Sequence, residues 1–357
     1  MNGPIRVLVV DDSASARGLI GALIAAAPGL ILCGEAKHGR EAVAQVLALK
    51  PDIVTMDINM PVMNGMDAIA EIMAVRATPI LVLSDLADAS MAVAAVARGA
   101  LEVAGKPALD EGPAFAARLE MLARVPVIRH IRWSSRPDRP EIPTTPDTSS
   151  AAVQRSGLAP YRVVAIAAST GGPQALGQLL PSLPADFPAP VLIAQHIADG
   201  FAAGMAAWLD TISPLSISLA RDGDPLAAGR VYLADSRTHL LVGASGRLTL
   251  VPRRDENIYR PSCDTLLTSV ARYAGARAVG VILTGMGRDG VDGLLAIHRG
   301  GGMTIAQDEA SSVVFGMNQE AIRAGAIRWV LPLAEIAAAL CRLTGAPHPI
   351  HGPMIAS

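Results

Sequence analysis

The chain has 357 residues, of which 51% are apolar, 3% aromatic and 17% charged. This length allows two domains with complete cores, and the composition favours packed helices and strands over an all-β or a disordered chain. The formal net charge of −2 provides no overall basic field, which argues against nucleic acid as a partner.

The three cysteines, Cys33, Cys263 and Cys341, are far apart and form no CxxC pair. They indicate a reducing compartment and exclude a disulfide or zinc framework. No secretory signal opens the chain, because the first apolar run, Ile5–Val10, ends in two aspartates. A proline and a glycine interrupt the longest apolar region, residues 19–32, so we expect a cytoplasmic protein without a membrane span.

Strands and helices alternate over the first 125 residues. Apolar runs predict strands over Ile5–Val10, Leu30–Cys33, Asp52–Met56 and Ile80–Leu83, and helical spacing covers Glu41–Leu49 and about Ala114–Ala123. A short fifth strand region ends at Lys106. This alternation predicts a doubly wound parallel sheet.

Polar residues follow these strands where each one ends: Asp11, Asp12, Asp57, Ser84 and Lys106. At one sheet edge the three carboxylates would repel one another unless a cation neutralised them, and carboxylate oxygens suit Mg²⁺. An acid at a strand end also serves as a simple helix cap, which is a plausible interpretation for Asp12 alone but a poor one for the whole set.

The set resembles the receiver domain of bacterial two-component response regulators. The resemblance implies a flavodoxin-like fold in which Asp57 accepts a phosphoryl group from a histidine kinase. It also implies that Asp11, Asp12 and Asp57, with the backbone of Asn59, bind the Mg²⁺ needed for phosphorylation.

Two further roles follow from the same resemblance. Ser84 corresponds to the switch hydroxyl, and Lys106 to the amine that pairs with the phosphoryl group. The bond between Lys106 and Pro107 is expected to be cis. Receivers usually carry an aromatic residue shortly before this lysine, whereas Ala100–Val103 contains none.

The composition changes after residue 125. Pro, Ser, Thr and Arg dominate from Pro126 to Leu158, and such a segment cannot bury enough apolar surface to fold alone. We therefore divide the chain into a receiver domain over residues 1–125, a flexible linker over 126–158, a catalytic domain over 159–345 and a tail over 346–357.

Strand and helix alternate again in the second domain, which we expect to be a Rossmann-like parallel sheet. Strands are predicted over Val163–Ile166, Val191–Ala194, Val279–Leu283 and Thr304–Ala306, and helices over Ala175–Leu180, about Ala202–Leu209, Asp264–Tyr273 and from about Gly293. Between them, residues 221–251 contain three short strands, near Val231–Leu233, Leu240–Val242 and Leu248–Val251, which we interpret as a β-hairpin excursion at the sheet edge.

Ser169 lies in a tight turn between the first of these strands and the first helix. Gly171 and Gly172 allow the backbone to fold back and leave amide N–H groups free to face an anion. The carboxyl end of a parallel strand is where ligands bind in open α/β sheets. The hydroxyl there is either a nucleophile beside an oxyanion pocket or a helix cap.

Three strand ends carry Ser169, His196 and Asp289. Acyl transfer needs such a trio, because an imidazole must take the serine proton and a carboxylate must orient that imidazole. His239 and His298 are competing bases, but one lies in the hairpin region and the other in a helix body. Each of the three residues alone has a structural interpretation, and the combination is what points to a hydrolase.

The second domain resembles the catalytic domain of the chemotaxis protein-glutamate methylesterase. The resemblance is carried by Ala165–Leu176, Ala194–His196, Ile282–Gly290, Thr304–Glu309 and Ser311–Met317. It implies Ser169 as nucleophile, His196 as general base and acid, and Asp289 as orienting carboxylate. Met286 would donate a backbone N–H to the oxyanion, and Thr170 would support the histidine.

The combined resemblance implies a phosphorylation-activated serine hydrolase that demethylates γ-glutamyl methyl esters on methyl-accepting chemoreceptors and deamidates receptor glutamines, giving adaptation in chemotaxis. No metal is expected in the esterase step, and the protein is expected to be a monomer.

Three other functions were weighed. A dinucleotide-binding dehydrogenase needs an acid where Gln195 and His196 stand. A DNA-binding output domain needs a basic recognition helix, which the sequence lacks after the linker. A non-enzymatic, receiver-controlled regulator that only binds a partner is the remaining alternative.

Overall fold

The computed structural model describes residues 3–84, 91, 94–96, 98–125, 163–254 and 259–347. The predicted linker, 126–158, and residues 348–357 of the predicted tail lie outside the described residues.

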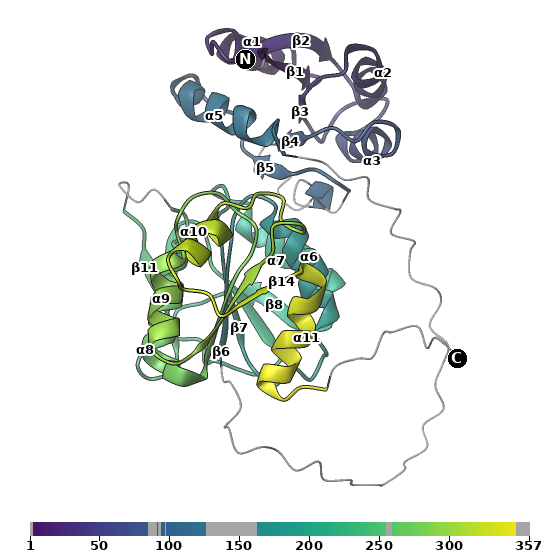
Figure 1. The fold of residues 1–357 in the computed structure, drawn as a ribbon. Helices are drawn as coiled ribbons and strands as arrows, with labels where there is room; N and C mark the ends of the chain where they lie inside the picture. Colours follow the sequence, from purple (N-terminus) through teal and green to yellow (C-terminus); the bar gives the residue numbers. More distant parts are fainter. Residues whose placement is uncertain are drawn as a thin grey trace, which may run out of the picture.

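The first unit is a five-stranded parallel sheet with helices on both faces (Figure 1). Its strands are β1 (Ile5–Val10), β2 (Leu30–Ala36), β3 (Ile53–Met56), β4 (Ile80–Leu83) and β5 (Glu102–Ala104), in the order β2-β1-β3-β4-β5. The helices are α1 (Ala14–Ala25), α2 (Gly39–Leu49), α3 (Gly65–Val75) and α5 (Gly112–Leu122), with a 3₁₀ turn η2 (Leu109–Glu111).

Successive side chains of β1 point to opposite faces of this sheet. Val7 and Val9 belong to the core formed with α1 and α5, whereas Leu8 and Val10 belong to the core formed with α2 and α3. A strand buried on both faces reads as a continuous apolar run, and the buried run Val7–Val10 is why this strand was predictable from the sequence.

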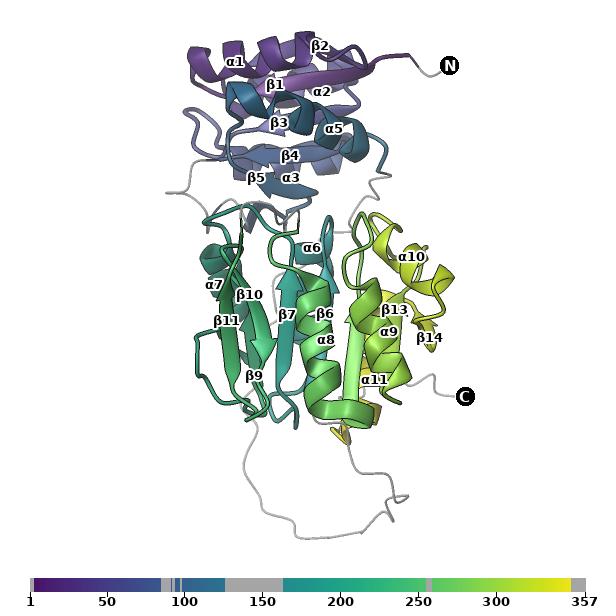
Figure 2. The same cartoon turned by 90° about the vertical axis from the view of Figure 1, so that its left-hand side faces the viewer.

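The second unit is a seven-stranded parallel sheet, again covered on both faces (Figure 2). Its strands are β6 (Val163–Ala168), β7 (Val191–Gln195), β8 (Ser216–Leu219), β9 (Arg230–Leu233), β12 (Ala278–Ile282), β13 (Met303–Gln307) and β14 (Trp329–Leu331), in the order β14-β13-β12-β6-β7-β9-β8. The helices are α6 (Gly172–Leu179), α7 (Ala202–Ile212), α8 (Cys263–Ala274), α9 (Val291–Arg299), α10 (Met317–Arg323) and α11 (Leu333–Thr344), with 3₁₀ turns η3 (Leu180–Ser182) and η4 (Gly275–Arg277).

β6 lies at the centre of this sheet, between β7 and β12. Its alternate residues face α8 and α9 on one side and α6, α7 and α11 on the other. The chain runs from β6 to β7 on one side and later returns to β12 on the other, so a crevice opens at the carboxyl end of β6. Ser169 follows β6 at this point.

The expected hairpin excursion was only partly right. β10 (Thr238–Val242) and β11 (Leu248–Pro252) form an antiparallel pair outside the main sheet, as predicted. β9, however, lies inside the main sheet and pairs in parallel with β7 and β8. The predictions lacked β8 and β14, which are short and partly exposed strands at the two edges of the sheet.

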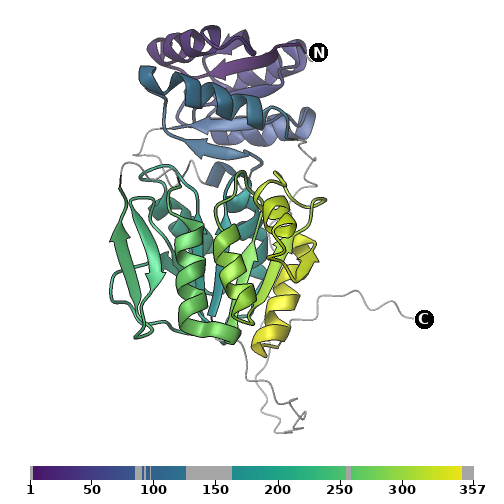
Figure 3. The same ribbon diagram turned by 60° about the vertical axis from the view of Figure 1, so that its left-hand side comes forward.

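The five-stranded unit lies over one end of the seven-stranded sheet, with β5 facing it (Figures 2 and 3). None of the described helices has the length and apolar character needed to cross a bilayer.

Candidate active site

The turn after β6 is fixed by backbone and glycine geometry. The Ser169 N–H donates to Thr284 O at 3.1 Å, which ties the turn to the segment after β12. Gly171 has a φ of +77° and precedes the first residue of α6. A Cβ on Gly172 would collide with Gln195 Oε1 and lie 2.8 Å from Ala168 Cβ, so the close packing favours glycine there.

Ser169, His196 and Asp289 meet above this edge of the sheet. His196 Nδ1 lies 3.2 Å from Ser169 Oγ, and His196 Nε2 lies 2.8 Å from Asp289 Oδ2. A carboxylate accepts hydrogen bonds, so the Nε2 proton points to Asp289 and leaves the Nδ1 lone pair for the serine hydroxyl. The imidazole is therefore in the tautomer that a general base for Ser169 needs.

Asp289 is held as an anion by the first turn of α8. Its Oδ2 also accepts from the Cys263 N–H at 2.6 Å, and its Oδ1 accepts from the Asp264 N–H at 2.9 Å and from Ser262 Oγ at 3.2 Å. Burial alone would raise the pKa of Asp289, but the hydrogen bond and charge of His196 and these backbone donors outweigh it and lower that pKa. Asp289 thus stays ionised beside the imidazole.

Two further residues complete the surroundings of the imidazole. The ring of Tyr259 stacks on His196, with centroids 5.2 Å apart and planes 13° from parallel. This contact covers one face of the imidazole and favours its cation. His239 Nδ1 accepts from the Ser262 N–H at 3.1 Å, so His239 supports the segment that holds Asp289. The imidazole beside the Ser169 hydroxyl is thus that of His196, and not that of His239 or His298.

The segment after β12 is fixed from the other side. Gln307 Oε1 accepts from the Thr284 N–H at 2.9 Å, and the Gly285 N–H donates to Val314 O at 3.0 Å. The N–H groups of Gly316 and Met317 both donate to Gly285 O. These contacts fix the peptide that leads to Met286, whose backbone N–H was predicted to stabilise the oxyanion. The Met286 side chain is exposed.

Thr170 has a different partner from the one expected. Its hydroxyl donates to Glu102 Oε2 at 3.1 Å instead of supporting His196, because β5 of the other unit reaches this edge. Glu102 Oε1 in turn pairs with Arg118 at 3.0 Å. Gln174 Nε2 on α6 donates to Ala100 O at 2.7 Å. The two units therefore meet beside the predicted nucleophile.

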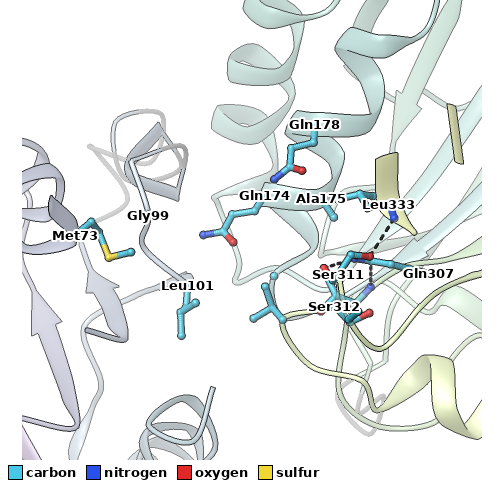
Figure 4. Close-up of a pocket in the computed structure, with 14 residues that line it drawn as sticks. Met73, Gly99, Leu101, Gln174, Ala175, Gln178, Gln307, Ser311, Ser312 and Leu333 are labelled. Atoms are coloured by element: carbon cyan, nitrogen blue, oxygen red, sulfur yellow. Dashed lines mark hydrogen bonds between the residues drawn. The ribbon is translucent and has the colours of Figure 1, made fainter. Parts of the chain in front are cut away.

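A cavity of about 160 Å³ lies at this junction (Figure 4). Met73, Gly99 and Leu101 line it from one unit, and Gln174, Gln178 and the segment 310–313 line it from the other. The junction is thus incompletely packed.

The other predicted cluster also forms. Ligand oxygens of Asp11, Asp12 and Asp57 all lie within 4.8 Å of one another. Lys106 Nζ is 2.9 Å from Asp11 Oδ2 and 3.6 Å from Asp57 Oδ2. Apart from Lys106, none of the described residues donates to Asp11 Oδ2. Three carboxylates that converge in this way fit a hard divalent cation.

The environment of Asp57 is the reverse of that of Asp289. Burial raises the pKa of Asp57 to about 6, helped by the charges of Asp11 and Asp12 and opposed by Lys106. A bound cation would remove this penalty.

The structure also places Ser84 and shows the peptide bond between Lys106 and Pro107. Ser84 is buried directly after β4, and its N–H donates to Ala104 O at 3.1 Å. The expected cis bond between Lys106 and Pro107 was wrong, since the cis peptide recorded among the described residues is Arg260–Pro261. Lys106 reaches both carboxylates without it.

Five residues around the two sites were not predicted from the sequence: Tyr259, Ser262, Asp264, Glu102 and Gln174. Ser262 and Asp264 follow the typical pattern of a helix N-terminus, which was the available signal. Glu102 and Gln174 carry no such signal, because their partners lie in the other unit.

Comparison with known proteins matches each of the two units to a family. The family model of the CheB methylesterase matches residues 164–340, and that of the response regulator receiver domain matches residues 7–112. A protein-glutamate methylesterase/protein-glutamine glutaminase of Paramagnetospirillum magneticum is 47% identical over 349 residues, covering 96% of this chain and 97% of that relative. Another, from Anaeromyxobacter dehalogenans, is 46% identical over 347 residues, covering 96% and 97%.

The solved structure of the Thermotoga maritima CheB methylesterase catalytic domain has 38% sequence identity and a TM-score of 0.49, and it covers 51% of this chain and 98% of its own. The identity with the two full-length relatives, over nearly the whole of each chain, establishes the family. The chain belongs to the family of protein-glutamate methylesterases/protein-glutamine glutaminases that carry a response regulator receiver domain.

Proposed function

We propose that Ser169 is the nucleophile of a phosphorylation-controlled hydrolase that demethylates γ-glutamyl methyl esters on chemoreceptors and deamidates receptor glutamines. The observation that carries this proposal is the pair of contacts joining Ser169 Oγ to His196 Nδ1 and His196 Nε2 to Asp289 Oδ2, at 3.2 and 2.8 Å. The family membership of the chain supports the same activity.

The proton path follows from the tautomer of His196. As Ser169 Oγ attacks the ester carbonyl, its proton moves to Nδ1, and Asp289 stabilises the imidazolium through Nε2–H. The Met286 N–H is proposed to donate to the oxyanion that forms. Nδ1–H then protonates the leaving methoxide, and methanol departs from an acyl-enzyme.

Water completes the reaction by the same path in reverse. His196 Nδ1 takes a proton from the attacking water and returns it to Ser169 Oγ, which releases glutamate. A glutamine side chain would follow the same steps with ammonia as the leaving group. This step uses the side chains of the triad and backbone donors of the site.

We propose Asp57 as the phosphorylation site, with a histidine kinase as the donor. Asp11, Asp12 and Asp57 would hold Mg²⁺, which supplies charge neutralisation for phosphoryl transfer to the Asp57 carboxylate. Lys106 lies within reach of two of these carboxylates and would pair with the new phosphoryl oxygens, while Ser84 responds as the switch hydroxyl.

The junction between the units supports control of the esterase by this site. Glu102 and Ala100 contact Thr170 and Gln174, which lie one and five residues after Ser169. We propose that these contacts restrict the access of the chemoreceptor to Ser169. Phosphorylation of Asp57 would release the restriction by shifting the β4–β5 side of the receiver.

The experiment is hydrolysis of a chemoreceptor carrying labelled methyl esters, measured as methanol release by the wild type and by Ser169→Ala. The proposal requires that release by the variant fall to background. Release that survives the substitution would favour the alternative, a regulator that binds a partner without hydrolysing it.

A further inference from the structure

Cys263, the first residue of α8, lies directly beside the proposed base. Its Sγ is 3.6 Å from His196 Nε2 and 3.4 Å from Ala194 O, and the side chain is fully buried. A buried cysteine usually acts as a small core residue. This one, however, points at the ring nitrogen that meets Asp289, and the ligand atoms of His196, Cys263 and Asp289 all lie within 4.8 Å of one another.

We propose that Cys263 Sγ, His196 Nε2 and Asp289 Oδ2 form an inhibitory binding site for Zn²⁺. The inference rests on the proposed function, because the metal acts by occupying the triad. Thiolate, imidazole and carboxylate are the donors that zinc prefers in proteins.

The spacing of the donors suits tetrahedral zinc. With Zn–S and Zn–N distances of about 2.3 and 2.0–2.1 Å, a tetrahedral site places sulfur and nitrogen about 3.6 Å apart. The observed distance between Cys263 Sγ and His196 Nε2 is 3.6 Å. The 2.8 Å between Nε2 and Asp289 Oδ2 must widen by about 0.5 Å, because a metal ion is larger than the proton it replaces.

Charge also favours the ion. Zn²⁺ together with one thiolate and one carboxylate has no net charge, which reduces the cost of placing it in a buried site. The ion would enter from the side of His196, whose side chain is 16% exposed.

The proton balance explains why binding inhibits. The Cys263 thiol loses its proton to solvent and its sulfur lone pair binds the ion. The imidazole keeps one proton, which moves from Nε2 to Nδ1 as the Nε2 lone pair binds the ion. Nδ1 then donates a hydrogen bond and cannot accept the proton of Ser169, so the nucleophile is not activated.

The activity test compares the wild type with Cys263→Ala and Cys263→Val, the second of which fills most of the volume of the cysteine. Saturating Mg²⁺ occupies the receiver carboxylates, and each protein is assayed after incubation with Zn²⁺ and compared with its own metal-free rate. We expect the Zn²⁺ concentration for half-inhibition to rise by about 10- to 100-fold in both variants.

Cys341→Ala is the matched control, because Cys341 is equally buried but lies on α11, on the opposite face of the sheet. Its sensitivity should equal that of the wild type. Equal sensitivity in the wild type and both Cys263 variants would overturn the proposal.

A binding test separates this inference from the proposed function. Cd²⁺ bound to a thiolate gives an ultraviolet charge-transfer band, whether or not the protein has esterase activity. We expect the band in the wild type and Cys341→Ala and its loss in both Cys263 variants. If the protein hydrolyses no ester but shows this pattern, the metal site stands and the proposed function fails. The absence of the band from the wild type, or its presence in the Cys263 variants, would refute the metal site.

Discussion

Asp57 and Asp289 occupy comparable places in two parallel sheets, each after a buried strand, but their surroundings give them opposite chemistry. Asp57 is crowded by Asp11 and Asp12, and burial raises its pKa to about 6. Asp289 accepts hydrogen bonds from His196, Ser262 and two backbone N–H groups at the start of α8, and its pKa is lowered.

The comparison shows that position in the fold does not decide what a carboxylate does. A crowded carboxylate needs a cation to relieve repulsion, and the same cation would neutralise the charge that a phosphoryl group adds, so the cluster suits a regulated acceptor site. A carboxylate saturated with donors is a fixed anion, so it suits the orientation of an imidazole.

The largest effect is expected from Ser169→Ala. Removal of the nucleophile should lower kcat for ester hydrolysis by about 10⁴-fold or more, as for other serine hydrolases. Methanol release measures the loss. Phosphorylation of Asp57 in the same variant is the control and should continue at the wild-type rate, because the acceptor lies in the other sheet.

Asp289→Asn tests the fixed anion. An amide at this position no longer favours the proton on Nε2, so Nδ1 becomes protonated and cannot serve Ser169. We expect kcat to fall by about 10³–10⁴-fold with little change in KM. A loss of less than tenfold would contradict the assigned tautomer. Asp264→Asn is a matched control, since Asp264 holds Asp289 through its backbone N–H, which the substitution retains.

The cluster around Asp57 predicts a pH dependence. The pKa of Asp57 is raised in the folded state, so its contribution to stability is present below about pH 4 and is lost as the pH rises through about 6. Mg²⁺ needs the ionised form, so its affinity should fall by about tenfold for each pH unit below 6. Calorimetry at several pH values measures this. In Asp57→Asn the pH dependence near 6 should disappear, and its persistence there would assign it to another group.

Some parts of the two sites could be predicted from the sequence, and others could not. Ser169, His196 and Asp289 follow strands of one parallel sheet, and Asp11, Asp12 and Asp57 follow strands of the other. The carboxyl ends of parallel strands lie at the same edge of their sheet, so the convergence of each group was predictable. The contacts that hold Asp289 were not predictable, because the sequence indicates that a helix begins near Asp264 but not that the backbone N–H groups of Cys263 and Asp264 bind Asp289. The partner of Thr170 was missed for another reason, since Glu102 reaches it only through the packing of the two units.

Tyr259→Leu tests the stacked ring over His196. Loss of the aromatic face destabilises the imidazolium that forms during attack, and we expect kcat to fall by about tenfold. Tyr259→Phe keeps the aromatic face and should restore the rate of ester hydrolysis. A rate that does not change in the leucine variant would show that Tyr259 only fills space.

The smallest effect is expected from Glu102→Ala. The substitution removes the contact with Thr170 and the ion pair with Arg118, so the receiver should hold the esterase less firmly. We expect the basal rate to rise by a few-fold, which corresponds to about 1 kcal/mol, the typical net contribution of one hydrogen bond. Glu71→Ala, an exposed substitution on α3, is the control and should leave the basal rate unchanged. An unchanged basal rate in Glu102→Ala would remove this contact from the regulatory account.

Methyl-ester turnover on chemoreceptors, measured with and without a phosphodonor in the wild type and in Asp57→Asn, tests most directly whether the crowded carboxylate controls the serine site. The account predicts that the donor accelerates the wild type alone. Equal rates in all four conditions would contradict it.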